Sequence, residues 1–100
     1  MVKYKIVHIC YSDKNKIPEY VYKKLKKQNP DYDINLYGDK ECYDFLLKYF
    51  SKDYAIFFNN ISDGPIKADF WRLCILYIFG GVYLDIDVEL YKPLDFIIPD

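Results

Sequence analysis

The sequence predicts an α/β fold in which a small parallel sheet of three strands is flanked by helices. Short runs rich in β-branched and apolar residues alternate with longer segments that have helical spacing and helix-boundary signals. Each strand-like run is separated from the next by at least one helical segment, and such connections join parallel strands of one sheet. The 100 residues are expected to form a single domain.

The first strand is expected at residues 4–10, where the run YKIVHIC is apolar and rich in β-branched residues. His8 lies within it and is the only histidine of the chain. A lone histidine in a strand is expected to be a core residue with hydrogen-bonded ring nitrogens. We therefore give His8 no catalytic role.

A polar loop follows, and Pro18 is expected to open a helix because proline suits the first helical turn. The helix should end at Asn29–Pro30, since the residue before a proline avoids the helical conformation. Its lysines should face water. Its buried side should consist of Tyr20, Val21 and Leu25.

Residues 32–37 should form a second strand, parallel to the first because a helix separates the two. Asp39 is expected to cap a helix over residues 40–49. The buried residues of this helix should be Phe45, Leu46 and Tyr49. Residues 52–60 are expected to form a further helix, although the run YAIFF within them also has strand propensity.

The next helix is expected to begin at Pro65, with Ser62 or Asp63 as its cap. Within residues 66–79 the segment is apolar on nearly every side after Arg72, which predicts a helix buried in the core.

The charged residues Asp69 and Arg72 in this apolar helix call for a functional or structural explanation. Asp69 and Arg72 are three residues apart, so they share one helical face and can pair or bind a polar ligand.

Gly80 and Gly81 should end the helix, since glycine adopts the left-handed conformation common at helix ends. A third strand should follow over residues 82–90. Its apolar face should comprise Val82, Leu84, Ile86, Val88 and Leu90, and its acidic face Tyr83, Asp85, Asp87 and Glu89. Carboxylates on alternate strand residues lie about 6 to 7 Å apart, so they repel unless water or a cation intervenes. Such oxygen ligands suit magnesium or manganese.

Composition narrows the function classes. The net charge is −1, and the lysines cluster without a nucleic-acid reader motif, so nucleic-acid binding is not indicated. The three cysteines form no C-x-x-C pair, which suggests reduced thiols in the cytosol. The longest apolar segment, residues 73–79, is too short to span a bilayer, and the N-terminus has no signal-like run. We expect a cytoplasmic or otherwise soluble protein.

The run ADxxR at residues 68–72, followed by a helix and by GGVYLDID at residues 80–87, resembles the DXD-containing glycosyltransferases with the GT-A fold. The similarity is greatest to the group of yeast-type initiating mannosyltransferases, and clostridial glucosylating toxins are more distant. In such enzymes the first strand commonly ends in an apolar-apolar-His-x-x-Trp pattern. Residues 7–11, VHICY, match it with tyrosine in place of tryptophan.

The resemblance implies a Rossmann-like nucleotide-sugar-binding half and a donor that is a UDP- or GDP-linked hexose. Tyr11 would stack on the nucleotide base. Asp87 would ligate Mn2+ or Mg2+, and Asp85 would contact ribose or sugar hydroxyls or hold a metal-bound water. Asp69 and Arg72 would bind the sugar and a neighbouring phosphate oxygen. Transfer would proceed with retention of configuration to an unknown glycan, protein or lipid acceptor.

An argument independent of the resemblance leads to the same edge of the sheet. Ligands of open α/β sheets bind beyond the carboxyl ends of the strands. Tyr11 and the pair Asp85 and Asp87 fall at those ends in the predicted fold.

Other functions stay open. GT-A enzymes generally need a second half, so residues 1–100 would be the N-terminal half, an enzyme completed by an oligomeric partner, or a donor-binding module without turnover. The run LDIDV at residues 84–88 also fits the first motif of haloacid-dehalogenase-like phosphatases. A third alternative is an interaction domain that binds cations through its acidic face.

Overall fold

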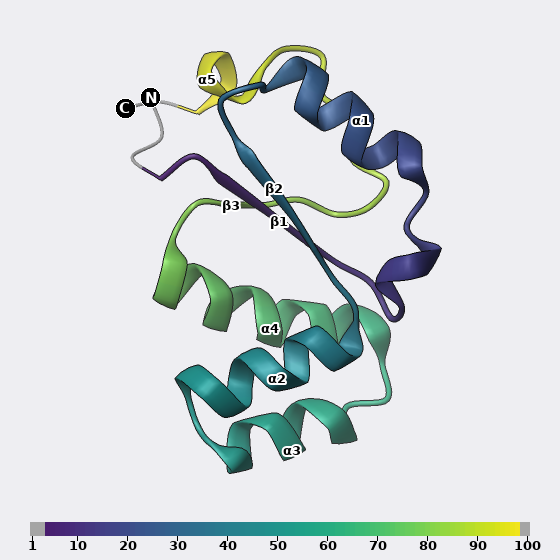
Figure 1. Ribbon diagram of the computed structural model, residues 1–100. Coiled ribbons are helices and arrows are strands. Elements are labelled where there is room, and N and C mark those ends of the chain that lie inside the picture. The colour runs from purple at the N-terminus through teal and green to yellow at the C-terminus, as the bar shows by residue number, and fades with distance from the viewer. Residues whose placement is uncertain (1–3, 99–100) are drawn as a thin grey trace.

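The computed structural model describes residues 4–98 and confirms the α/β fold (Figure 1). Its sheet has three parallel strands in the order β2-β1-β3. The strands are β1 (Ile6–Cys10), β2 (Asp33–Tyr37) and β3 (Val82–Tyr83). The order places the N-terminal strand in the centre, as expected for strands joined by helical crossovers.

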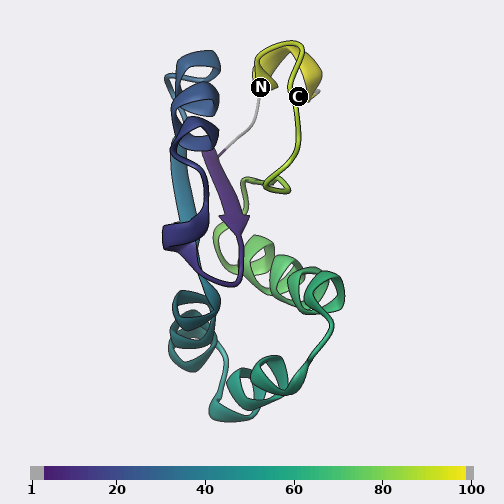
Figure 2. The same ribbon diagram turned by 90° about the vertical axis from the view of Figure 1, so that its right-hand side faces the viewer.

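The helices divide between the two ends of the molecule. They are the 3-10 helix η1 (Lys14–Lys16) and the α-helices α1 (Glu19–Gln28), α2 (Asp39–Tyr49), α3 (Lys52–Asn60), α4 (Gly64–Phe79) and α5 (Leu94–Ile97). Helices α2, α3 and α4 gather at the end where β1 and β2 finish, and α1 and α5 lie at the other end (Figures 1 and 2). Within residues 4–98, no helix is both long and apolar enough to cross a bilayer.

Side-chain alternation along β1 connects two hydrophobic clusters. Val7 and Ile9 enter the cluster that α1 covers, which we call the α1 cluster. Its buried members are Val7, Ile9, Ile17, Val21, Leu25, Tyr32, Ile34 and Leu94. The other cluster, which we call the Trp71 cluster, lies among α2, α3 and α4, and Cys10 packs against it. Its buried members are Cys42, Phe45, Leu46, Ala55, Phe58, Trp71, Cys74 and Ile75.

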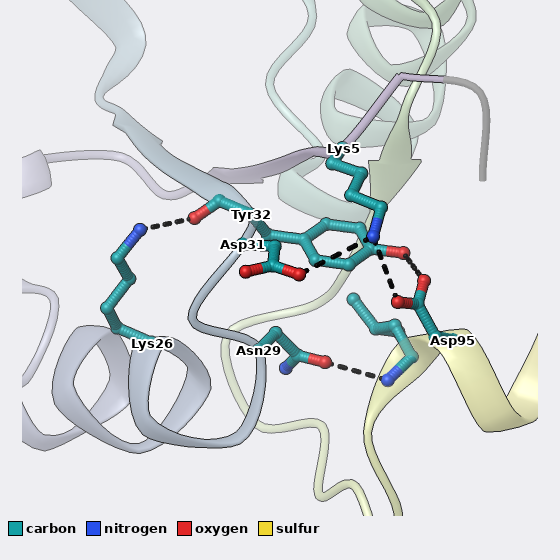
Figure 3. Close-up of polar contacts among 7 residues, drawn as sticks. Lys5, Lys26, Asn29, Asp31, Tyr32 and Asp95 are labelled. Atoms are coloured by element: carbon teal, nitrogen blue, oxygen red, sulfur yellow. Dashed lines mark hydrogen bonds and ion pairs between the residues drawn. The ribbon is translucent and has the colours of Figure 1, made fainter. Parts of the chain in front are cut away.

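A polar network attaches the C-terminal helix α5 to the rest of the fold (Figure 3). The Tyr32 hydroxyl donates to Asp95 over 2.8 Å, and Lys5 donates to the same carboxylate over 3.1 Å. Asn29 accepts a bond of 2.7 Å from the backbone N–H of Leu94. Burial, together with the Asp95 carboxylate, raises the pKa of Tyr32 to about 12.

The boundaries of α4 follow from local chemistry, as predicted. The Asp63 side chain accepts from the backbone N–H of Ile66, and the helix ends at Gly80 and Gly81. These glycines have φ angles of 66° and 88°, in the left-handed region. A Cβ on Gly81 would lie 2.5 Å from the carbonyl oxygen of Ile6, so only glycine lets the chain approach β1 this closely.

The prediction that α4 is buried all round is wrong. Trp71, Cys74 and Ile75 are buried, but its other side is exposed. Exposed fractions there are 58% for Ile66, 68% for Leu73 and 81% for Tyr77. Apolar composition predicts that a helix needs cover, but within residues 4–98 no element covers this side.

The predicted strand over residues 82–90 is wrong beyond Tyr83. The N–H of Leu84 makes one more bond to β1, at the carbonyl of His8, and then Val88 donates to the carbonyl of Asp85 to close a turn. The alternation of apolar residues still predicted which side chains are covered, because Leu84, Ile86 and Leu90 pack against the α1 cluster. Aspartate favours turns over strands, which is consistent with the bend here.

Three smaller expectations also differ from the structure. Tyr20 is exposed, because Val21 and Leu25 alone form the buried stripe of α1. Tyr49 contacts Phe45 yet stays 38% exposed, since its ring lies at the margin of the Trp71 cluster. The cap of α2 is Gly38 rather than Asp39; the Gly38 N–H donates to Glu41.

Candidate functional site at the carboxyl ends of the strands

The loop after β1 is held by backbone bonds and leaves one aromatic ring accessible. The N–H of Tyr11 donates to the carbonyl of Tyr37 over 2.9 Å, and the N–H of Asp39 donates to the carbonyl of Ser12 over 3.0 Å. The Tyr11 side chain is 43% exposed at this edge of the sheet. Its backbone is therefore fixed while its ring can contact a ligand.

Asp69 and Arg72 lie on one face of α4, as predicted. The Nη2 atom of Arg72 lies 3.3 Å from Oδ1 of Asp69, and both side chains are partly exposed. The guanidinium carbon lies 5.8 Å from the ring centroid of Tyr83, within the range of a cation–π contact. An exposed ion pair of this kind contributes little to stability, so both groups are available to a polar ligand.

Tyr83 connects this pair to β1. Its hydroxyl lies 3.2 Å from the sulfur of Cys10. Burial, followed by the bond to Cys10, raises the pKa of Tyr83, and the charge of Asp85 adds to the effect. The charge of the Asp85 carboxylate also acts to raise the pKa of the Cys10 thiol. The structure thus brings Arg72, Tyr83 and Cys10 together at the ends of β1 and β3, and Asp85 follows Tyr83 by two residues in the chain.

Cys42 is buried in the Trp71 cluster, and Cys10 packs against the same cluster. The influence of Cys42 lowers the pKa of Cys10 most, and burial opposes it. For the deeply buried Cys42, burial is the largest cause of a raised pKa, and its neighbour raises it further. Cys10 is the more acidic and the more accessible of the two.

Asp87 has different surroundings from Asp85. It lines a cavity of about 130 Å³ between the loop and α1, together with Lys24, Gln28 and Glu89. Lys24 lies 3.8 Å from the Glu89 carboxylate. The structure therefore does not bring Asp87 into the group around Tyr83.

Asp85 and Asp87 could bind a divalent ion only if water and a bound substrate supplied the remaining ligands of the ion. Both residues are exposed, and residues 4–98 contain no group of three or more histidine, cysteine or acidic side chains arranged for a metal. Magnesium-like ions commonly use one or two carboxylates and complete their shell with water and substrate phosphates. Two exposed carboxylates two residues apart meet this minimal requirement.

His8 is a buried core residue whose two ring nitrogens both have hydrogen-bond partners, as predicted. It is 1% exposed, and its Nε2 lies 3.0 Å from the carbonyl oxygen of Gly80. A carbonyl only accepts, so Nε2 carries the proton and Nδ1 accepts from the Tyr37 hydroxyl over 3.2 Å. Burial lowers the pKa of His8. The ring therefore stays neutral and fixes the end of α4 against β1.

Sequence reasoning missed Lys67. Its Nζ lies 3.1 Å from Oδ2 of Asp39, and its side chain is only 16% exposed. The signal was present, because Lys67 precedes the buried residues Trp71 and Cys74 by four and seven positions on one helical face. A charge on a buried face needs a partner, and the partner is supplied by α2.

Comparison with known proteins identifies the family. A family profile described as the glycosyltransferase sugar-binding region containing a DXD motif matches residues 16–100. The chain belongs to this family of DXD glycosyltransferases. The matched region includes Asp69, Arg72, Asp85 and Asp87, but Tyr11 lies outside it.

Curated relatives are yeast mannosyltransferases. The chain is 39% identical over 70 residues to the initiation-specific alpha-1,6-mannosyltransferase of Candida albicans, covering 68% of the chain and 18% of the relative. It is 34% identical over 97 residues to the inositol phosphoceramide mannosyltransferase 3 of Schizosaccharomyces pombe, covering 91% and 26%. The chain thus spans about a quarter or less of these relatives. No solved structure matches it significantly.

Proposed function

We propose that this chain is the donor-binding part of a glycosyltransferase that moves a hexose from a nucleotide diphosphate sugar to an acceptor. The observation that carries the proposal is the contact of the Asp69–Arg72 pair with Tyr83 at the carboxyl end of β3, two residues before Asp85. This is the edge where open α/β sheets bind ligands. The names of the yeast relatives favour mannose as the hexose.

Each group has a defined part in the proposed complex. The ring of Tyr11 stacks on the base, and Arg72 donates forked hydrogen bonds to a phosphate oxygen while Asp69 accepts from sugar hydroxyls. Asp85 and Asp87 hold Mn2+ or Mg2+ together with the diphosphate. A divalent ion there would neutralise the charge that grows on the departing diphosphate.

Calorimetric titration tests the proposal. The chain is titrated with GDP-mannose and with UDP-glucose, with and without Mn2+. We expect Mn2+-dependent binding of GDP-mannose that Asp87→Asn weakens by about tenfold or more, since charge-assisted contacts are worth about 1.5 to 3 kcal/mol. Asp53→Asn is the matched control, because Asp53 is an exposed carboxylate on α3.

The titration, together with a phosphatase assay, also separates the alternatives. Binding of Mn2+ with the same affinity with and without nucleotide would favour a cation-binding interaction domain. Release of phosphate from a phosphate ester, with a trapped aspartyl intermediate, would favour a phosphatase. Failure of the folded chain to bind either donor in the presence of Mn2+ would reject the proposal for this chain.

A further inference from the structure

We propose that Lys67 is a positioning residue that holds the loop after β1 in a fixed relation to α4, so that the two ends of the donor are bound together. The inference rests on the proposed donor site and adds a residue to it. Lys67 contacts neither the base nor the sugar in this proposal. It acts through Asp39, and through that residue on the backbone next to Tyr11.

The first step is the environment of the Lys67 ammonium group. Its Nζ lies 3.1 Å from Oδ2 of Asp39 and 4.6 Å from the ring centroid of Phe58. The lysine side chain is only 16% exposed and that of Asp39 is 43% exposed, so the ammonium side of this ion pair is shielded from water while the carboxylate side is half accessible. Three helices meet at this one group, because Asp39 begins α2, Phe58 belongs to α3 and Lys67 belongs to α4.

The second step leads from Asp39 to the predicted base-binding ring. The backbone N–H of Asp39 donates to the carbonyl of Ser12 over 3.0 Å, and Ser12 follows Tyr11 directly. Tyr11 is itself bonded through its N–H to the carbonyl of Tyr37. The ion pair at Asp39 therefore holds one of the two backbone bonds that fix this loop.

The third step leads from Lys67 to the predicted sugar-binding pair. Asp69 and Arg72 follow Lys67 by two and five residues on the same helix, so their positions relative to it are set by helical geometry. A movement of Lys67 away from Asp39 would change the distance between Tyr11 and Arg72. A donor that spans both groups gains affinity only while that distance is preorganised.

The test begins without any donor. Amide hydrogen exchange is measured for Lys67→Met, which keeps the aliphatic stem and removes the charge. We expect the Asp39 and Tyr11 amides to exchange about tenfold faster than in the wild type, while central β1 amides are unchanged. Lys67→Arg should restore slow exchange. Unchanged exchange at Asp39 in Lys67→Met would overturn the proposal.

A matched control uses a lysine in an exposed pair. Lys23 lies 3.1 Å from Glu19 on α1, the same separation as in the Lys67 pair, but both of its groups are largely exposed. Lys23→Met should leave the exchange of Asp39 and Tyr11 at the wild-type rate. Faster exchange in this variant as well would show a general loss of stability, and would overturn the assignment to Lys67.

The second measurement uses GDP-mannose and GMP as probes in the presence of Mn2+. GMP keeps the base but lacks the hexose and the phosphate next to the hexose, which the Asp69–Arg72 pair would bind, so it does not span the two groups. We expect Lys67→Met to weaken GDP-mannose binding by about tenfold and GMP binding by less than about twofold. Equal losses for the two ligands would indicate a merely structural role and would overturn the proposal.

The two measurements separate this inference from the function on which it rests. If the wild-type chain binds no donor, the proposed function fails, and with it the coupling of donor ends. The exchange rates still decide whether Lys67 holds the loop.

Discussion

Replacement of Gly81 by alanine should destabilise the fold strongly. Gly81 has a φ of 88°, and a Cβ there would lie 2.5 Å from the carbonyl oxygen and 3.2 Å from the Cβ of Ile6. The left-handed conformation costs a residue with a side chain about 1 to 2 kcal/mol. Overpacking against a neighbour that cannot move adds about 1 to 3 kcal/mol. The carbonyl belongs to β1, so we expect a total loss of about 2 to 5 kcal/mol.

Two other glycines calibrate this estimate. A Cβ on Gly64 would meet nothing within 4 Å outside its chain neighbours, while Pro65 disfavours a helical alanine before it, so these effects oppose each other and Gly64→Ala should change the stability by less than about 1 kcal/mol. A Cβ on Gly80 would lie 3.1 Å from the ring of Tyr4, a side chain that can move. Gly80 has a φ of 66° and a ψ of −155°, a region adopted almost only by glycine, so Gly80→Ala should cost mainly backbone strain, about 1 to 3 kcal/mol.

The assay is urea unfolding followed by tryptophan fluorescence. Trp71 is the only tryptophan of the chain and is fully buried, so its emission reports loss of the core around it. The reasoning is refuted if Gly81→Ala loses less than about 1 kcal/mol, or no more than Gly64→Ala, because the close approach to β1 would then not require glycine.

Three further predictions concern other contacts. Acidification below pH 6.5 should lower the free energy of unfolding, because burial lowers the pKa of His8 and the unfolded chain then binds a proton that the folded chain does not. The stabilisation from neutral His8 is fully present above the unfolded pKa of 6.5 and is lost as the pH falls toward the lower folded pKa. Urea unfolding across this range should show a free energy of unfolding that falls with pH, and His8→Gln should remove this fall. An equal fall in the variant would contradict the assignment to His8. Iodoacetamide should alkylate Cys10 before Cys42, because Cys10 is more accessible and its pKa is lowered whereas that of Cys42 is raised. Peptide mass mapping measures the order of alkylation, and alkylation of Cys42 first would refute this prediction. Asn29→Ala should destabilise the chain by about 1 to 3 kcal/mol in urea unfolding, because the buried N–H of Leu94 loses its acceptor and the carbonyl of Leu25 loses a donor; an unchanged free energy of unfolding would contradict this.

The sequence by itself determined the order of the three strands and of helices α1 to α4, and most of their boundaries; it did not predict η1 or α5. Signals such as Asn29–Pro30, Pro65 and Gly80–Gly81 act on backbone within a few residues, so they can be read without knowing the rest of the fold. Helical spacing likewise sufficed to place Asp69 beside Arg72.

Tertiary structure decided where periodic patterns stop and which distant groups meet. The alternation of apolar and polar residues continues to Leu90, but hydrogen bonding to β1 ends at Leu84. A strand needs backbone hydrogen-bond partners, whereas an apolar side chain needs only a surface to pack against, so the two patterns end at different residues. Lys67 and Asp39 are 28 residues apart, and no local rule connects them. Local signals depend on neighbours in the chain, whereas contacts between α2 and α4 depend on how the whole chain packs.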